Sequence, residues 1–151
     1  MRDAPVLRYA KDHEMETPQL EQGISTLSSP FGVDETLNRL ERLATSRGMT
    51  IFARVNFGRD AEKAGLKMQP SQLLILGNPK GGTPLMVAAP RSALDLPLKV
   101  LAWADETGRC WVSCNTPEYL QQRHGFPSAL IANIAPLGAL VHAALEPDAA
   151  K

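Results

Sequence analysis

Two cysteines and two histidines are the residues in this chain most able to do chemistry. Cys110 and Cys114 could act as thiol nucleophiles or redox groups if a neighbouring charge lowered their pKa, and His124 and His142 could act as bases. Nothing resembles the GxSxG motif of hydrolases, and no Cys or His lies in a recognised catalytic context. The CxxxC spacing also lacks the short paired spacings of structural zinc sites. We therefore expect no catalytic set, no metal and no cofactor.

The spacing of the cysteines predicts that they are not bonded to each other. On one strand, Cys110 and Cys114 would point to the same face with about 13 Å between their Cα atoms. A disulfide needs less than about 7 Å. We expect free thiols on a core-facing strand, which fits a reducing compartment. A thiol-based redox or enzymatic protein using Cys114 or Cys110 is retained as an alternative.

The turn 77–83, with the sequence GNPKGGT, is the best candidate for a binding site. It fails the phosphate-loop signature GxxxxGK[ST], because Thr83 follows Gly82 directly. A strand end, glycines and a helix N-terminus would nevertheless expose backbone N–H groups that can bind an anion. Lys80 would add positive charge. A purely structural turn is the alternative, since glycines allow tight turns.

A second turn, 95–97, follows and completes the candidate pocket. Met86 and Leu96 would line its apolar part, while Asp95 could instead bond to the backbone of its own turn. The expected ligand-binding residues come from both turns and are Gly77, Asn78, Pro79, Lys80, Gly82, Thr83, Met86, Asp95 and Pro97.

Strands and helices that would position these residues alternate along the chain. Patterns of apolar and β-branched residues predict strands at 23–28, 50–57, 72–76, 98–104 and 109–115. Helices are expected at 33–47, 60–64, 83–89, 117–124 and 128–145. Thr83 would cap the third helix with Pro84 at its first position, and Pro136 should kink or split the last one. The hairpin 98–115 should bring Trp103 and Trp111 together.

This order of elements predicts an α+β fold, a two-layer sandwich in which helices pack on a mostly antiparallel sheet of about five strands. We expect residues 1–22 to be a flexible N-terminal arm, 23–146 to be a single domain and 147–151 to be a tail.

Composition argues against several classes of protein, although a local basic patch remains open. Sixteen Lys and Arg residues balance sixteen Asp and Glu residues in 151, which argues against nucleic-acid or anionic-membrane binding. The N-terminus has no apolar run of signal-peptide length, so we expect a cytoplasmic protein. The most apolar segment, 129–145, contains Asn133, Pro136 and His142, and we expect a packed helical segment there and no membrane span.

The central stretch resembles the domain-of-unknown-function 302 family. Its hallmarks here are Gly-Asn-Pro at 77–79, Gly-Thr-Pro-Leu-Met at 82–86 and Asp-Leu-Pro-Leu at 95–98, with supporting matches in the first helix and the hairpin over about 23–145. The resemblance implies a compact fold related to TATA-binding-protein domains, often dimeric, and no established activity. This chain departs from the family in having Asn56-Phe57 where relatives often carry Asp-His, and Cys114 where they often carry Tyr.

These observations lead to one main hypothesis and two alternatives. We expect a small non-enzymatic domain, a homodimer, that binds a small ligand or a protein partner near the turn 77–83. The thiol-based protein and a purely structural homodimer remain the alternatives.

Overall fold

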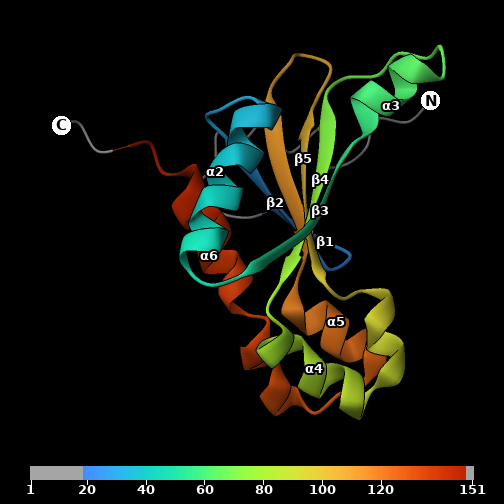
Figure 1. Cartoon of the computed structure of the whole chain (residues 1–151), viewed down its shortest axis with the longest axis vertical. Helices are drawn as coiled ribbons and strands as arrows, with labels where there is room; N and C mark the ends of the chain where they lie inside the picture. Colours follow the sequence, from blue (N-terminus) through green and yellow to red (C-terminus); the bar gives the residue numbers. More distant parts are fainter. Residues whose placement is uncertain (1–18, 149–151) are drawn as a thin grey trace.

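The computed structural model describes residues 19–148, which form an antiparallel sheet with helices packed against it (Figure 1). The strands are β1 (Gln19–Glu21), β2 (Ile24–Ser29), β3 (Thr50–Asn56), β4 (Ser71–Gly77), β5 (Leu98–Ala104) and β6 (Cys110–Asn115). Their order across the sheet is β1-β2-β6-β5-β4-β3, and every neighbouring pair is antiparallel. The five predicted strands are all present, and the α+β class is confirmed.

A sixth strand lies where a flexible arm was expected. Gln19–Glu21 pairs with β2, so these three residues belong to the sheet. The rest of the predicted arm, 1–18, lies outside the described residues, as does the end of the predicted tail, 149–151. The described part of that tail contains Asp148, whose carboxylate forms an ion pair with Arg39 at 3.1 Å.

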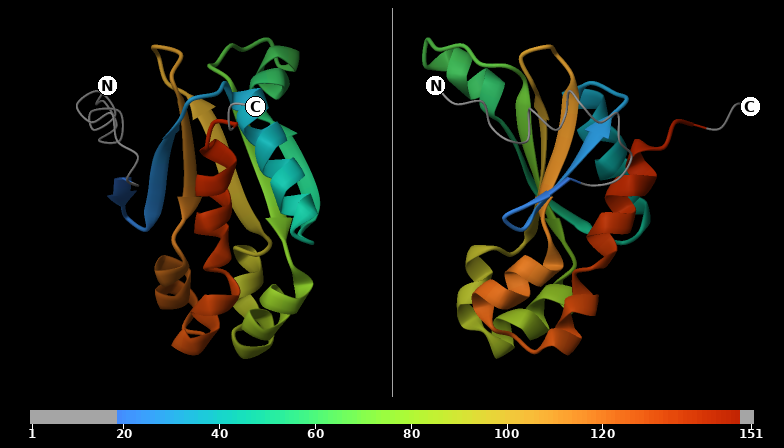
Figure 2. Two further views of the ribbon diagram at one scale, coloured as in Figure 1. Left: turned by 90° about the vertical axis from the view of Figure 1, so that its left-hand side faces the viewer. Right: turned by 180° about the vertical axis from the view of Figure 1, so that it is seen from behind.

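Two helices, α2 (Val33–Ser46) and α6 (Pro136–Leu145), lie side by side over one face of the sheet (Figure 2). The apolar stripe of α2 is buried as its spacing predicts, and Leu37 and Leu40 are almost fully inaccessible. They belong to one core with Leu140 of α6 and Leu74 of β4. Burial of this stripe is what holds α2 on the sheet.

The remaining helical segments gather mostly at one end of the sheet (Figure 1). They are α4 (Pro79–Ala88), η1 (Pro90–Leu94), α5 (Pro117–His124) and η2 (Ser128–Asn133). A separate helix, α3 (Phe57–Lys63), lies at the opposite end of the sheet and contains no buried residue. The candidate site therefore has to be sought where α4 and η2 meet the end of the sheet.

Helix α4 begins five residues earlier than predicted, at Pro79 instead of Pro84. Thr83 is not its cap and Pro84 is not its first residue, because both lie inside the helix. Asn78 caps it instead, its side-chain oxygen accepting from the backbone N–H of Lys80 at 3.0 Å, and Pro79 takes the first helical position. Asn is among the best N-caps and Pro suits the position after it, so Asn-Pro outcompetes Thr-Pro as the start.

Asn56 performs the same task for α3. Its side chain accepts from the backbone N–H of Arg59 at 3.0 Å, so β3 ends there and Phe57 begins the helix. The predicted helix at 60–64 was therefore too short, and the predicted strand was one residue too long. Asn56 is one of the residues in which this chain departs from the family pattern, and the helix cap gives it a structural role.

Three further predictions are confirmed. The last helix is split in two, with α6 restarting at Pro136 after η2. Trp103 and Trp111 lie directly opposite each other across the β5–β6 hairpin, with ring centroids 6.4 Å apart. Both cysteines are free thiols on β6.

Candidate functional site

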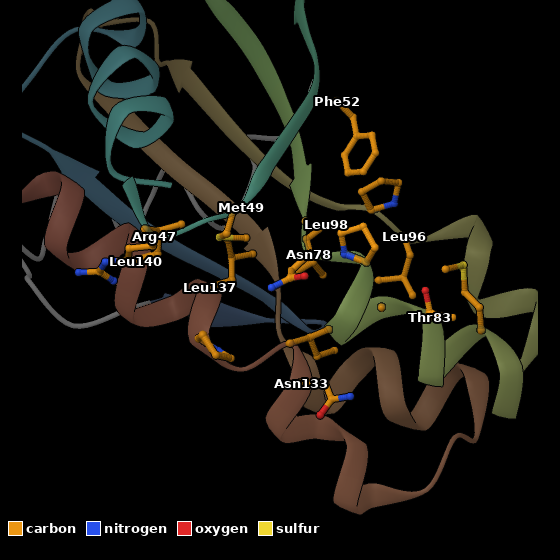
Figure 3. A pocket seen from close by; sticks show the side chains of 17 residues that line it. Arg47, Met49, Phe52, Asn78, Thr83, Leu96, Leu98, Asn133, Leu137 and Leu140 are labelled. Atoms are coloured by element: carbon orange, nitrogen blue, oxygen red, sulfur yellow. The ribbon is translucent and has the colours of Figure 1, made fainter. Parts of the chain in front are cut away.

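A pocket of about 400 Å³ opens where the ends of β3, β4 and β5 meet α4 and the segment from η2 to α6 (Figure 3). Its volume falls within the usual range for small-molecule sites, and its wall is mainly apolar with a few polar groups. Seven of the nine predicted ligand-binding residues line this pocket. They are Gly77, Asn78, Pro79, Gly82, Thr83, Met86 and Pro97, and Leu96 lies with them as expected.

Lys80 and Asp95 are not among the lining residues. Lys80 is exposed on the first turn of α4. The carboxylate of Asp95 lies in contact with α5, where its Oδ2 is 2.5 Å from His124 Nε2 and 3.2 Å from an Arg123 guanidinium nitrogen. Asp95 therefore ties the turn 95–97 to the end of α5, and the expectation that it bonds to its own turn backbone is wrong. His124 lies at the C-terminus of α5, as predicted.

The other half of the pocket wall was not predicted as part of a site. Except for Leu98 at the start of β5, it comes from the end of α2, the start of β3 and the segment from η2 to α6, all distant in sequence from the turn 77–83. The residues are Arg47, Met49, Phe52, Leu98, Asn133, Ile134, Pro136, Leu137 and Leu140. Ile134, Leu137 and Leu140 carry the apolar periodicity of a packed helix, which the sequence does show. Their second role at a cavity has no sequence signal of its own.

The backbone of the turn 77–83 is not the anion site that was predicted. Pro79 has no N–H, and the N–H of Lys80 donates to the Asn78 side chain. The N–H groups of Gly81 and Gly82 both donate to the carbonyl of Asn78 at 2.9 Å. The first N–H groups of α4 thus bond within the turn itself, and none remains to bind an anion.

The two adjacent glycines have different structural roles. A Cβ atom on Gly81 would lie 2.9 Å from the carbonyl oxygen of Asn133, so a glycine lets α4 approach η2 closely. The Asn133 side chain also donates to the Gly81 carbonyl at 3.1 Å. A Cβ atom on Gly82 would meet nothing within 4 Å, because this residue faces the pocket.

Three neutral polar side chains line the pocket and can bind a ligand. Asn78 uses its oxygen for the helix cap, which leaves its Nδ2 as a donor. Asn133 uses its Nδ2 for Gly81, which leaves its Oδ1 as an acceptor. Thr83 adds a hydroxyl that can donate or accept. The site can therefore orient a polar group by hydrogen bonds while apolar side chains surround the rest of a ligand.

The cysteines lie apart from this pocket and are poorly suited to nucleophilic chemistry. Cys110 is buried in the core, and Cys114 is half-buried and lines a smaller cavity of about 130 Å³. Burial raises the pKa of both thiols, and hydrogen bonding to Thr36 and Ser29 only partly offsets this for Cys110. A thiol nucleophile needs the opposite shift.

No group of three or more His, Cys, Asp or Glu side chains within residues 19–148 could hold a metal ion. One stretch, Ser128–Leu145, is long and apolar enough by length and composition to cross a membrane, with a mean hydropathy of 1.6. In the structure this stretch is broken between η2 and α6, and α6 packs against α2.

The fold and the pocket define a small α+β domain with an open cavity at one end of its sheet. The family described as "Domain of unknown function DUF302" matches residues 25–144, and the chain belongs to it. The crystal structure of an uncharacterized conserved DUF302 protein from Bacillus stearothermophilus has the same fold. It superposes with a TM-score of 0.69 at 20% identity, covering 83% of this chain and 97% of that one.

Longer relatives contain the same kind of sequence. Proteins named "Fluoride-specific ion channel FluC 1" from Brucella suis and "FluC 2" from Brucella melitensis are each 43% identical over 105 residues. The match covers 70% of this chain but 41% and 39% of those proteins. The chain thus spans about two fifths of the length of these curated relatives.

Proposed function

We propose that this protein is a small-molecule binding module and that its ligand occupies the pocket between α4, the sheet end and α6. The observation that carries the proposal is the cavity itself, which is already formed and lined mainly by apolar side chains with a few convergent polar groups. We further propose that the domain acts in the cytoplasm and does not catalyse a reaction. A segment of a protein partner is the alternative occupant of the same pocket.

The polar groups support binding more than catalysis. Asn78, Thr83 and Asn133 are neutral and can fix the orientation of a ligand, but none is a strong acid, base or nucleophile at neutral pH. The thiol alternative places its reactive group at Cys114 or Cys110, and the raised pKa values of both weigh against it.

A thermal-shift screen of a metabolite library tests the proposal, because a ligand that binds only the folded protein raises its melting temperature. The variant Gly82→Leu should fill the pocket from its open side, since nothing lies within 4 Å of the position that a Cβ would take. Thr45→Leu, at an exposed position of α2, adds the same side chain away from the pocket and serves as the control.

Genuine ligands should raise the melting temperature of the wild type and of Thr45→Leu but not of Gly82→Leu. A screen without hits, or hits that bind Gly82→Leu as well as the wild type, would contradict the proposal.

The second candidate is a purely structural homodimer module. The observation favouring it is the position of β3, which ends the strand order of the sheet and exposes Thr50, Phe52 and Ala53. An edge strand presents backbone groups that can pair with a second chain. Light scattering across a dilution series would show the mass of two chains if this candidate is right, and of one chain at all concentrations if it is wrong.

A further inference from the structure

The charge of the pocket lining limits what the pocket can bind. Among the described residues that line it, Arg47 is the only charged one, and the lining includes no Asp or Glu. A cationic ligand would be desolvated there with no opposite charge, and Arg47 would repel it. The lining therefore favours a neutral or anionic ligand.

The guanidinium of Arg47 is available to bind an anionic ligand. Other arginines of the domain are occupied, such as Arg39 with Asp148 and Arg54 with Asp34. Within residues 19–148, no side chain or backbone group forms a hydrogen bond or ion pair with the guanidinium of Arg47. Its planar group can donate two parallel hydrogen bonds to one carboxylate.

The surroundings of Arg47 suit the apolar part of such a ligand. Arg47 lies beside Leu140 at one end of the pocket, with Leu137 and Met49 next along the wall, whereas Thr83 lies at the other end (Figure 3). A ligand whose charged group contacts Arg47 would extend along these apolar side chains. The second negative charge of a phosphate monoester would have no cation to pair with in this apolar lining, so a carboxylate is favoured over a phosphate monoester.

We propose that the pocket selects an apolar monocarboxylate, with its carboxylate at Arg47 and its apolar body against Leu137, Leu140 and Met49. This inference rests on the proposed function, because it specifies which class of ligand the same pocket binds.

Isothermal titration calorimetry with three probes of equal chain length tests it: octanoate, 1-octanol and octyltrimethylammonium. The main chain of each has eight carbon atoms, the carboxylate carbon of octanoate included, and the heads differ in charge. The alkyl tail of octanoate is one carbon shorter than that of octanol, so any tighter binding of octanoate comes from its head and not from its tail. Each is titrated into the wild type, Arg47→Gln and Gly82→Leu. The variant Arg59→Gln makes the same substitution on α3, away from the pocket, and is the matched control. Melting curves establish that each variant is folded.

Octanoate should bind the wild type and Arg59→Gln more tightly than octanol, and octyltrimethylammonium should bind most weakly. Arg47→Gln should weaken octanoate binding about three- to fivefold, the size expected for an exposed ion pair, and leave octanol unchanged. The ratio of the affinities for octanoate and octanol should also become smaller as salt is added.

Two other outcomes overturn the inference in different ways. If octanol binds as tightly as octanoate and Gly82→Leu abolishes the binding of both, the pocket binds ligands regardless of their charge. The inference then fails while the proposed function stands. If octanoate binds Gly82→Leu and Arg47→Gln as well as the wild type, binding lies outside the pocket, and neither the inference nor the proposed function is supported.

Discussion

The side chain of Asn133 donates a hydrogen bond to the backbone carbonyl of Gly81 across two segments that are 52 residues apart in the chain. The carbonyl of Asn133 lies so close to Gly81 that a Cβ there would be 2.9 Å away. This contact holds η2 against α4, and the pocket lies beside the place where they touch. Its shape therefore depends on a glycine that lets two backbones approach.

The neighbouring glycines provide a matched test of this contact. Gly81→Ala should destabilise the protein by about 1–3 kcal/mol, because its new methyl group would push against the Asn133 backbone. Gly82→Ala should stabilise it by about 0.5–1 kcal/mol, because alanine favours a helix interior and nothing obstructs its Cβ. Urea unfolding of both variants measures the difference. Equal effects of the same sign would show that η2 does not constrain α4 at this position.

Asn78 should be required for the start of α4. Asn78→Ala removes the acceptor for the Lys80 N–H and should cost about 1 kcal/mol, as loss of a helix cap usually does. Asn78→Asp keeps the acceptor and should retain most of the stability. Thermal or denaturant unfolding gives both values. If alanine and aspartate cost the same, the cap does not determine where α4 begins.

Asp105, in the turn between β5 and β6, should make stability depend on acid pH. Burial opposes its ionisation, but hydrogen bonds from Thr107, Trp111 and Arg109 to the carboxylate outweigh it, and the pKa of Asp105 is lowered from its usual 3.8. A lowered folded-state pKa contributes stability above the unfolded-state pKa, and this stability is lost as the pH falls through the folded-state value.

Asp105→Asn should therefore be less stable than the wild type at pH 7 by about 1–2 kcal/mol, since an amide NH₂ cannot accept from Trp111. The difference in unfolding free energy between the wild type and Asp105→Asn should become smaller as the pH is lowered through 4 toward 2. Urea unfolding at several pH values measures it, with Glu106→Gln, an exposed neighbour, as the control. A gap that stays constant with pH would rule out the ionised carboxylate as its source.

Both cysteines should react slowly in the native protein. Burial raises the pKa of Cys110 and Cys114, so little thiolate is present at neutral pH. Iodoacetamide at pH 6 should label neither within the time that labels both in urea, as followed by mass spectrometry. Rapid native labelling of Cys114 would restore the thiol-based alternative.

Local patterns in the sequence predicted most of the elements correctly. The stripe of α2, the hairpin with its facing tryptophans and the break at Pro136 all follow from residue types at short spacing, where helix and strand periodicity act. The start of α4 was misplaced because two Xaa-Pro pairs, Asn78-Pro79 and Thr83-Pro84, compete within seven residues. The better cap, Asn78, determined the outcome.

The sequence alone also indicated where a pocket would lie, because the turns 77–83 and 95–97 interrupt apolar runs with glycine and proline. It could not show that Arg47, Leu137 and Asn133 form the opposite wall, since their proximity arises from packing of α6 and η2 against distant elements. Nor could it show how the polar groups of the turns are used. The first N–H groups of α4 bond within the turn and Asp95 pairs with His124, because tertiary packing decides which hydrogen-bonding partners each group can reach.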